Sequence, residues 1–284
     1  MPRIAYVNGR YLPHRHASVH IEDRGFQFAD GVYEVIAITN GKLVDIEPHL
    51  DRLNRSMGEL NIDLPVPRRA FGFILREVIR RNRVTNGSIY LQITRGVAAR
   101  DFTYPEGLRP SLVIYAKSTK KASIESASQG HAVVSQPDIR WARCDIKTIS
   151  LLPSVLAKRA ATEEGVADAW FVNEDGIVTE GTSSNAWIVT TTKELITRQT
   201  DNFILSGITR QTILKLASDA GLTITERPFS LKEAMQATEA FTSSSTALVK
   251  PVIKINGVQI GDGQAGRVTR QLIEHYLNYM DNSF

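Results

Sequence analysis

The chain has 284 residues, of which 42% are hydrophobic and 23% charged, and this balance predicts a globular protein with one large or two moderate domains. Its formal net charge is +4, but the Lys and Arg residues are scattered along the chain. No basic stripe of the kind that binds nucleic acid therefore stands out. No stretch is long and apolar enough to span a membrane, and the N-terminus lacks the apolar core of a signal peptide. Cys144 is the only cysteine, which excludes an intramolecular disulfide and predicts a lone buried thiol. We therefore expect a cytoplasmic protein without nucleic-acid or membrane partners.

The N-terminal part begins with the pattern of an antiparallel sheet. Residues 4–12 alternate around Asn8-Gly9 and residues 35–44 around Asn40-Gly41, and such Asn-Gly pairs are a strong hairpin signal. Two helical patterns and two strand patterns follow. Their apolar positions are Leu50, Leu53, Met57 and Leu60, then Phe71, Ile74, Leu75, Val78 and Ile79, then Ile89, Leu91 and Ile93, and finally Leu112 to Ala116. These patterns predict a first α+β domain over residues 1–117.

A polar segment, residues 118–129, contains few large apolar residues and is the expected interdomain linker. The second domain, residues 130–284, combines short strands with helices. A helix is expected over residues 207–220, with Ser206 as its N-cap and Gly221 at its end. Further signals are a capping box at Ser230 and Glu233, a strand from Glu239 to Thr242, a hairpin at Asn256-Gly257, and a last helix with Val268, Leu272, Tyr276 and Tyr279.

The stretch from Arg143 to Trp187 organises this second domain. Pro153 suits the first turn of a helix whose apolar side carries Val155, Leu156 and Ala160, and Gly165 can end that helix. Strands are then expected over residues 169–172, 177–180 and 185–190, with a turn at 173–176. This arrangement is expected to bring Lys147 and Glu180 into one cleft.

Five segments, in order along the chain, carry a resemblance to a known family. They are DRGFQFADGVYEV, PHLDRL, DIKTISLL, TEGTSSN and SGITR. Together they resemble the motifs of the fold-type IV pyridoxal-phosphate enzymes, most closely those of the D-amino acid transaminases, over nearly the whole chain. The resemblance implies a two-domain α+β fold, with a small N-terminal α/β sandwich and a larger C-terminal β-rich domain with helices.

The resemblance also implies an activity. Lys147, in DIKTISLL, matches the lysine that holds pyridoxal 5'-phosphate as a Schiff base and moves the proton at the substrate alpha carbon. The implied reaction is ping-pong transamination between D-amino acids and 2-oxo acids, with no metal. A plain surface lysine is the alternative for Lys147 when the motif is disregarded.

Further cofactor-binding residues follow from the same motifs. Glu180 matches the carboxylate that keeps the pyridine nitrogen protonated, and the helix start at Ile208 and Thr209 suits a phosphate dianion. Arg52 matches a phosphate-binding arginine, although on a helical wheel it points away from the Leu50, Leu53 and Met57 stripe and would otherwise be a solvated arginine. The remaining matches are Ser183, Ser184, Leu205, Ser245 and Thr246.

Four positions match the substrate side of the family's site. Tyr33 and Val35 would line a side pocket, and Arg100 matches an arginine that binds the substrate carboxylate from the partner subunit. The resemblance therefore implies a homodimer. Phe102 departs from the pattern, because the family has a histidine there, so one donor for the carboxylate is missing.

Several alternatives remain open from the sequence. A branched-chain L-amino acid transaminase, an (R)-amine transaminase and an aminodeoxychorismate lyase use the same cofactor machinery. They differ mainly in the pocket around Tyr33 and Arg100. A non-catalytic binding protein with a basic pI is the alternative from another class.

Overall fold

The computed structural model describes residues 3–282, which divide into two compact units. The first unit contains the chain up to Lys121 together with the separate segment Ile146–Ser150, and the second contains Ala122–Asp145 and the chain from Leu151 onward. The segment expected as a linker, residues 118–129, contains the short helix α4, Ile124–Ser128, which is capped by Ser123. Within residues 3–282, no helix has both the length and the apolar character that crossing a membrane requires.

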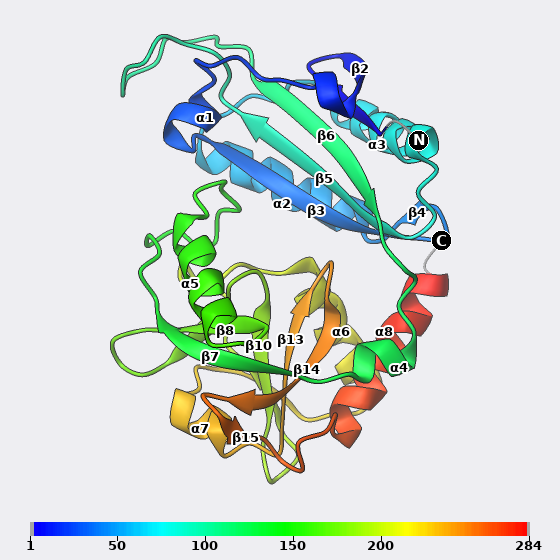
Figure 1. The fold of residues 1–284 in the computed structure, drawn as a ribbon, viewed down its shortest axis with the longest axis vertical. Coiled ribbons are helices and arrows are strands. Elements are labelled where there is room, and N and C mark those ends of the chain that lie inside the picture. The colour runs from blue at the N-terminus through cyan, green and yellow to red at the C-terminus, as the bar shows by residue number, and fades with distance from the viewer. Residues whose placement is uncertain (1–2, 283–284) are drawn as a thin grey trace. The chain divides into compact units, whose positions relative to one another are not determined.

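The first unit is built on a six-stranded sheet in the order β2-β1-β6-β5-β3-β4 (Figure 1). All of its strand pairs are antiparallel, and the hairpins expected at Asn8-Gly9 and Asn40-Gly41 are confirmed. Asn8 and Asn40 both have positive φ, which Asn and Gly tolerate best. The strands are β1 Ile4–Val7, β2 Arg10–Pro13, β3 Gly31–Thr39, β4 Lys42–Leu43, β5 Gly87–Thr94 and β6 Ser111–Ser118.

Two amphipathic helices, α2 Ile46–Glu59 and α3 Arg68–Asn82, cover one face of this sheet (Figure 1). Their apolar stripes and the alternate residues of the central strands form a single core, as the periodicity predicts. Two short helices, η1 His14–His16 and α1 Arg24–Phe28, lie between β2 and β3 in the chain. The expected apolar positions Leu50, Leu53, Met57, Phe71, Ile74, Leu75, Val78 and Ile79 are all buried.

The segment Ile146–Ser150 extends the sheet of the first unit beyond its own strands. Thr148 forms an antiparallel bridge with Val32 in β3, and the backbone N–H of Tyr33 donates to the Lys147 carbonyl at 3.0 Å. Ile146 is 4% exposed and joins the same core as α2 and α3. A piece of chain that lies between two parts of the second unit in sequence thus completes the first.

The second unit holds a nine-stranded sheet in the order β12-β11-β10-β13-β14-β7-β8-β9, with β15 paired to β14. The pairs β11–β12, β14–β7 and β7–β8 are parallel, and the others are antiparallel. The strands are β7 His131–Pro137, β8 Asp168–Val172, β9 Val178–Gly181, β10 Asn185–Val189, β11 Leu195–Thr197, β12 Ile224–Glu226, β13 Glu239–Ser244, β14 Leu248–Ile255 and β15 Val258–Gln259. The hairpin at Asn256-Gly257 is confirmed by the pairing of β14 with β15.

Four further helices belong to this unit: α5 Leu152–Glu163, α6 Ile208–Asp219, α7 Leu231–Met235 and α8 Arg267–Asn282. The Ser230 cap of α7 is confirmed by the hydrogen bond that its side chain accepts from the Glu233 N–H. The expected Ser206 cap of α6 is wrong, because Gly207 is the N-cap residue and no side chain caps that helix.

The buried face of α5 also differs from the sequence expectation. Val155 and Leu156 are 58% and 53% exposed, whereas Ala157 and Ala161 are buried in a small cluster with Phe171. Small side chains allow the helix to lie close to β7 and β8, so the larger apolar residues face outward.

Candidate functional site

Lys147 lies at the edge of the first unit's sheet, where its position is set by backbone pairing with β3. Its N–H donates to the Ser56 hydroxyl of α2 at 3.3 Å, and its Nζ lies 4.2 Å from the centroid of the Tyr33 ring. An ammonium over an aromatic face is stabilised by the ring's quadrupole. The predicted lysine and the predicted substrate-side tyrosine are therefore neighbours within this unit.

Tyr33 and Val35 alternate with Glu34 along β3, so both lie on the sheet face opposite to Glu34. The Tyr33 ring stacks on Tyr90 at 5.7 Å, and Tyr90 stacks on Tyr115 at 5.0 Å. This row of rings runs across β3, β5 and β6 and restrains the Tyr33 side chain.

Glu34 points to the other face, where it meets two residues of α2. Its carboxylate accepts bonds from Arg52 Nε at 2.8 Å and Nη2 at 2.7 Å, and it lies 2.7 Å from His49 Nδ1. Burial alone would raise the pKa of Glu34, but Arg52 and His49 outweigh it and lower that pKa to about 2. Burial lowers the pKa of His49, so the neutral ring donates its Nδ1 hydrogen to the ionised carboxylate.

This cluster corrects the helical-wheel expectation for Arg52. The side chain is 9% exposed rather than solvated, because the long arginine stem reaches back over α2 to a carboxylate on the neighbouring strand. Glu34 and His49 were missed by the sequence interpretation. A charged residue inside the apolar strand GVYEVIAIT was the available signal for Glu34.

Arg100 and Phe102 lie in the long connection between β5 and β6. Both are exposed, and both contact Phe28, with the Arg100 guanidinium 4.7 Å and the Phe102 ring 5.7 Å from the Phe28 ring centroid. No carboxylate among residues 3–282 pairs with Arg100. Its guanidinium is thus placed by aromatic contact and presents its donors to solvent.

A buried arginine holds this connection in place. Arg24 is 4% exposed and donates from Nη1 to the Asp101 carbonyl at 2.7 Å and from Nε to Asp30 at 2.9 Å. Asp30 also receives two bonds from Arg95, at 2.7 Å and 3.0 Å. Because Asp101 is the residue after Arg100, Arg24 anchors the backbone that carries the predicted carboxylate ligand. Sequence interpretation missed this role, although Arg24 stands in the DRG motif.

Glu180 lies at the end of β9 in the second unit and is 6% exposed. It accepts hydrogen bonds from Asn185 Nδ2 at 3.1 Å, from the Leu205 N–H at 3.2 Å, and from Arg140 Nη1. The carboxylate is therefore held by a charged donor together with neutral donors. The predicted cofactor contacts Glu180 and Leu205 are adjacent in this unit.

Arg140 is a second residue that the sequence interpretation missed. Its fork donates to Asp138 at 2.9 Å and 2.8 Å as well as to Glu180, and its guanidinium lies 4.6 Å from the Phe171 ring centroid. Burial lowers the pKa of Arg140, but Asp138 and Glu180 outweigh it and raise that pKa overall. Burial raises the pKa of the nearby Cys144 thiol to about 12. The thiol is half-buried, so the expectation of a fully buried cysteine is wrong.

The start of α6 lies against the same group of residues. Asn185 Nδ2 also donates to the Leu205 carbonyl at 2.9 Å, which fixes the approach to the helix. A Cβ on Gly207 would lie 2.2 Å from Asn185 Oδ1, so a larger residue would displace the Asn185 side chain. Ile208 and Thr209, the predicted phosphate residues, are the first residues of this helix, where backbone N–H groups lack partners within the helix.

The other predicted cofactor residues also lie in the second unit. Ser183 and Ser184 follow β9, and Ser245 and Thr246 form the turn between β13 and β14. Helix α6 packs against β13, so two of the three predicted phosphate-binding segments belong to neighbouring elements. Arg52 and Lys147 belong to the first unit. The expectation that Lys147 and Glu180 share one cleft stays a prediction.

Comparison with protein families and known proteins gives a consistent result. Residues 31–255 match the family model described as amino-transferase class IV. The D-alanine aminotransferase of Staphylococcus haemolyticus is 37% identical over 278 residues, which cover 98% of both chains. The D-alanine aminotransferase of Bacillus licheniformis is 40% identical over 265 residues, which cover 93% of both chains.

Solved structures are similar in fold. The branched-chain amino acid aminotransferase from Escherichia coli aligns with a TM-score of 0.86 and 24% identity, over 96% of this chain and 92% of that chain. A hypothetical aminotransferase from Mycobacterium tuberculosis, in a PLP-bound form, aligns with a TM-score of 0.83 and 22% identity, over 99% of both chains. These alignments confirm the expected fold-type IV, α+β architecture.

Proposed function

Because the chain belongs to the class IV aminotransferase family, it is a pyridoxal-phosphate-dependent aminotransferase, and we propose that it transfers amino groups between D-amino acids and 2-oxo acids. The observation that carries the D-amino acid assignment is the match to two D-alanine aminotransferases at 37% and 40% identity over nearly their full lengths. Similarity to the branched-chain enzyme of Escherichia coli rests on lower identity, 24%, and concerns the fold alone.

The donor set of this chain fits pyridoxal phosphate. Glu180 supplies a buried carboxylate for the pyridine nitrogen, and the first turn of α6 supplies free N–H groups for the phosphate. Arg52, Ser183, Ser184, Leu205, Ser245 and Thr246 are the other residues proposed to hold the cofactor. When bound, the cofactor supplies an electron sink for the negative charge that develops at the substrate alpha carbon.

We assign two tasks to Lys147. Its amine would hold the cofactor covalently, and the same amine would carry the proton at the substrate alpha carbon. The position of Lys147 supports both tasks, since its backbone is fixed by β3 while only its side chain extends toward Tyr33. A restrained backbone with a flexible amine allows the same group to act at two neighbouring atoms.

Reduction of the holoenzyme with borohydride tests this assignment. Peptide mass analysis is expected to place the pyridoxyl adduct on Lys147, and an adduct on Lys158 or Lys193 would contradict it. Lys147→Ala is expected to keep the fold, by circular dichroism, and to lose turnover. Lys193→Ala, a substitution in the turn between β10 and β11, is the matched control and is expected to keep parental activity.

Glu180 is proposed to hold a proton at the pyridine nitrogen. A carboxylate that must accept from a pyridinium has to be ionised, and the Arg140 guanidinium beside it favours the ionised form. Asn185 and the Leu205 N–H restrain the carboxylate further. Arg140 thus acts as a positioning residue that keeps Glu180 charged and oriented.

The substrate carboxylate is proposed to bind Arg100 of the partner subunit in a homodimer. An exposed guanidinium with no carboxylate partner within residues 3–282 supports this proposal, because it is free to form two parallel bonds to a carboxylate. Phe102 supplies no hydrogen-bond donor beside it. We therefore propose weaker carboxylate selectivity and some activity toward aromatic (R)-amines.

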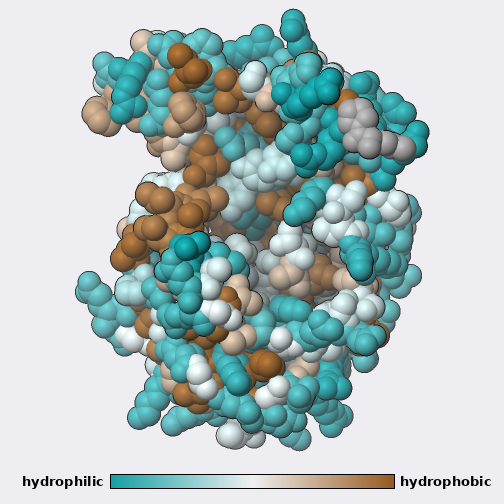
Figure 2. Space-filling model, viewed as in Figure 1, coloured by the Kyte–Doolittle hydropathy of each residue, from teal (hydrophilic) through white to brown (hydrophobic). Residues whose placement is uncertain are grey.

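An apolar surface on α5 supports the dimer. Leu152, Val155 and Leu156 are 67%, 58% and 53% exposed, and Figure 2 shows hydrophobic surface gathered over this helix. Apolar clusters of this kind are typical of subunit interfaces. Light scattering after size exclusion is expected to give a dimer, and the double variant Leu152→Glu and Leu156→Glu a monomer. Arg159→Glu on the same helix is the control, and a monomeric parent protein would contradict the dimer.

A panel of substrates separates this function from its rivals. We expect kcat/KM to be highest for D-amino acids with a 2-oxo acid acceptor, measurable for (R)-phenylethylamine, and lowest for branched-chain L-amino acids. Preference for L-leucine over D-alanine would favour the branched-chain alternative, and a colourless protein without cofactor absorbance would favour a binding protein. We propose a cytoplasmic location, which the lone cysteine supports.

A further inference from the structure

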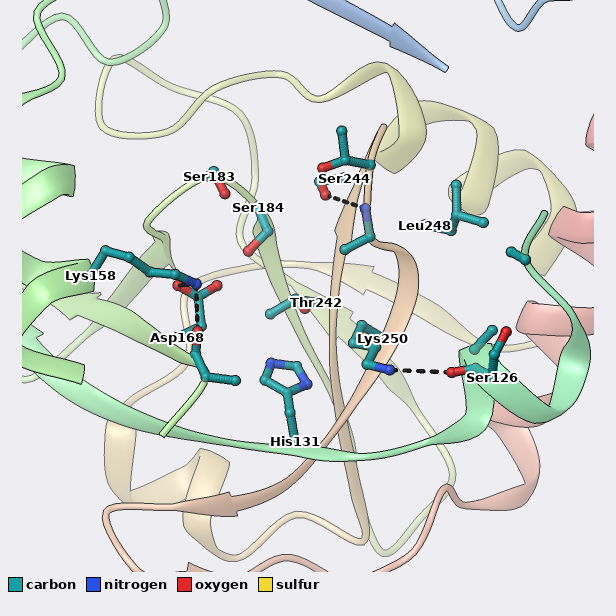
Figure 3. A pocket seen from close by; sticks show the side chains of 15 residues that line it. Ser126, His131, Lys158, Asp168, Ser183, Ser184, Thr242, Ser244, Leu248 and Lys250 are labelled. Atoms are coloured by element: carbon teal, nitrogen blue, oxygen red, sulfur yellow. Dashed lines mark hydrogen bonds and ion pairs between the residues drawn. The ribbon is translucent and has the colours of Figure 1, made fainter. Parts of the chain in front are cut away.

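The second unit contains a polar cavity of about 430 Å³ whose basic side chains have no part in the proposed function (Figure 3). It lies among β7, β8, β13 and β14, and residues of α4, α5 and the loop after β9 complete its lining. Three basic side chains, from His131, Lys158 and Lys250, reach it together with several hydroxyl groups. Ser183, Ser184 and Thr246, which are proposed cofactor contacts, line one side of the cavity, whereas Ile208, Thr209 and Glu180 are not among its lining residues.

The two lysines differ in their partners. Lys158 Nζ lies 3.2 Å from Asp168 Oδ1 and also donates to the Ala167 carbonyl, so its charge is compensated. Lys250 Nζ donates to the Ser126 carbonyl at 3.3 Å, and no carboxylate in the described part of the chain pairs with it. Burial lowers the pKa of Lys250, and no neighbouring carboxylate opposes that effect. Lys250 is therefore a partly desolvated cation that would gain from an anion.

His131 and a serine add polar groups without partners. His131 Nδ1 and Ser184 Oγ are both buried and have no hydrogen-bond partner. Buried polar atoms of this kind are rare in folded proteins and commonly mark an ordered water or a ligand. Figure 3 shows the His131 ring between Asp168 and Lys250, below Ser184 and Thr242. The wall of the cavity thus offers hydroxyl, imidazole and ammonium groups as hydrogen-bond donors, and Lys250 is the cation among them that has no carboxylate partner in the described part of the chain.

We propose that this cavity binds a small phosphate anion, either inorganic phosphate or a phosphate monoester, with Lys250 as its charged ligand. Hydroxyl groups, an imidazole and an ammonium group suit a tetrahedral oxyanion, which has several oxygens to accept hydrogen bonds. The charged ligands of this site, Lys250 and His131, have no role in the proposed transamination. Because Ser183, Ser184 and Thr246 also line it, a bound anion touches the loops that carry proposed cofactor contacts.

Isothermal titration of the cofactor-loaded enzyme with inorganic phosphate, at constant ionic strength set by chloride, tests the site. Saturable binding is expected, and Lys250→Gln is expected to weaken it roughly 10- to 100-fold, the loss typical of a charged hydrogen bond. Lys254→Gln, an exposed lysine on the same strand outside the cavity, is the control and is expected to bind like the parent. Equal affinity in the parent and Lys250→Gln, or no saturable binding, overturns the proposal.

Two further arms identify the ligand and the role of His131. Tighter binding of glycerol phosphate than of inorganic phosphate assigns the site to a monoester, the reverse assigns it to the free ion, and binding of acetate alone overturns the phosphate class. Burial holds the pKa of His131 below its ordinary value, so the ring gains its proton only at acidic pH. Sulfate keeps its charge down to about pH 4, so its affinity is expected to rise as the pH falls from about 6.5 to about 4, and not in His131→Gln. Asp168, Lys158 and Lys250 are the charged groups that face this ring. A flat profile in the parent overturns the assignment of His131.

Discussion

Each unit buries one glutamate beside one arginine, but the two pairs are built differently. In the first unit, both oxygens of Glu34 are occupied by Arg52 and His49, and the carboxylate is 0% exposed between a strand and a helix. In the second unit, Glu180 is 6% exposed at the end of a strand, and its partners are Arg140, a side-chain amide and a loop N–H.

The difference teaches that burial and an arginine partner do not by themselves mark a functional carboxylate. The Glu34 pair lies inside a sheet–helix layer and ties two elements together. The Glu180 pair lies where strands end and connections begin, which is where binding residues concentrate. We therefore expect Glu34 to serve stability, by fixing Arg52 to the sheet, and Glu180 to serve chemistry, and the predictions below test that division.

The largest effect is expected from Glu180→Gln. Loss of the charge removes the group that favours a protonated pyridine nitrogen, so the single-turnover rate of alpha-proton transfer should fall by about 10² to 10⁴. Stopped-flow absorbance measures this rate, and cofactor content should change much less. Glu174→Gln, in the exposed turn of the same hairpin, is the control. An unchanged rate of alpha-proton transfer in Glu180→Gln would contradict a chemical role for Glu180.

The next effect is a loss of stability in Glu34→Gln. Removing one partner from a buried ion pair leaves Arg52 without its counter-charge, which typically costs about 3–5 kcal/mol. Urea unfolding at neutral pH measures the free energy. The same substitution at Glu163, in an exposed pair with Arg159, is expected to change it by less than about 0.5 kcal/mol. A similar small change in Glu34→Gln would end the distinction between the two pairs.

We also expect Glu34→Gln to change how the free energy of unfolding depends on pH in acid. Because the pKa of Glu34 is lowered to about 2 in the folded protein, the unfolded chain binds this proton more readily. The stabilisation is complete above the ordinary glutamate pKa of about 4.3 and is lost as the pH falls toward about 2. Glu34→Gln should therefore flatten the stability curve in this acidic window.

Features set by local sequence could be predicted, whereas contacts set by the packing of distant elements could not. Hairpins at Asn-Gly pairs and amphipathic helices follow from local patterns, and they were predicted well. The Glu34–Arg52 pair depends on how α2 packs across β3, which periodicity does not encode. The outward face of α5 has the same cause, since apolar spacing predicts a face but not which neighbour it meets.

Arg100 differs from Arg52 and Arg140, because no carboxylate in the described part of the chain pairs with it. Arg100→Ala should lower kcat/KM for D-alanine by roughly 10- to 100-fold, because a charged hydrogen bond to the substrate carboxylate is lost. The value for (R)-phenylethylamine, which has no carboxylate, should change little. Arg109→Ala, an exposed arginine in the same connection, is the control. Equal losses on both substrates would make Arg100 a structural residue.

A smaller effect is expected from Arg24→Lys. Lysine keeps a charge near Asp30 but lacks the fork that reaches the Asp101 carbonyl, so the backbone around Arg100 should become mobile. We expect kcat/KM for D-alanine to fall roughly three- to tenfold, since one charged hydrogen bond is weakened rather than lost. Hydrogen exchange of residues 98–104 should rise in parallel. A loss of activity without faster exchange would contradict the positioning role.

For the site itself, the motifs predict residues by type and order, whereas the contacts that support those residues depend on the three-dimensional fold. Arg140 and Arg24 act on residues far away in sequence, and although Arg24 stands in the DRG motif, neither contact can be inferred from local sequence. Glu180 and Lys147 could be proposed from the sequence because each stands in a recognisable run of neighbours.

The segment Ile146–Ser150 has a consequence for how this protein is made. The first unit needs Ile146 for its core and Thr148 for its sheet edge, yet both are translated after the first strand of the second unit. During synthesis, the N-terminal unit therefore leaves the ribosome before the segment Ile146–Ser150 that completes it has been made. A gene fragment that stops at Lys121 would encode a sheet in which β3 lacks its pairing with Thr148 and a core that lacks Ile146. The two units of this enzyme therefore cannot be exchanged between proteins by cutting the chain at one point.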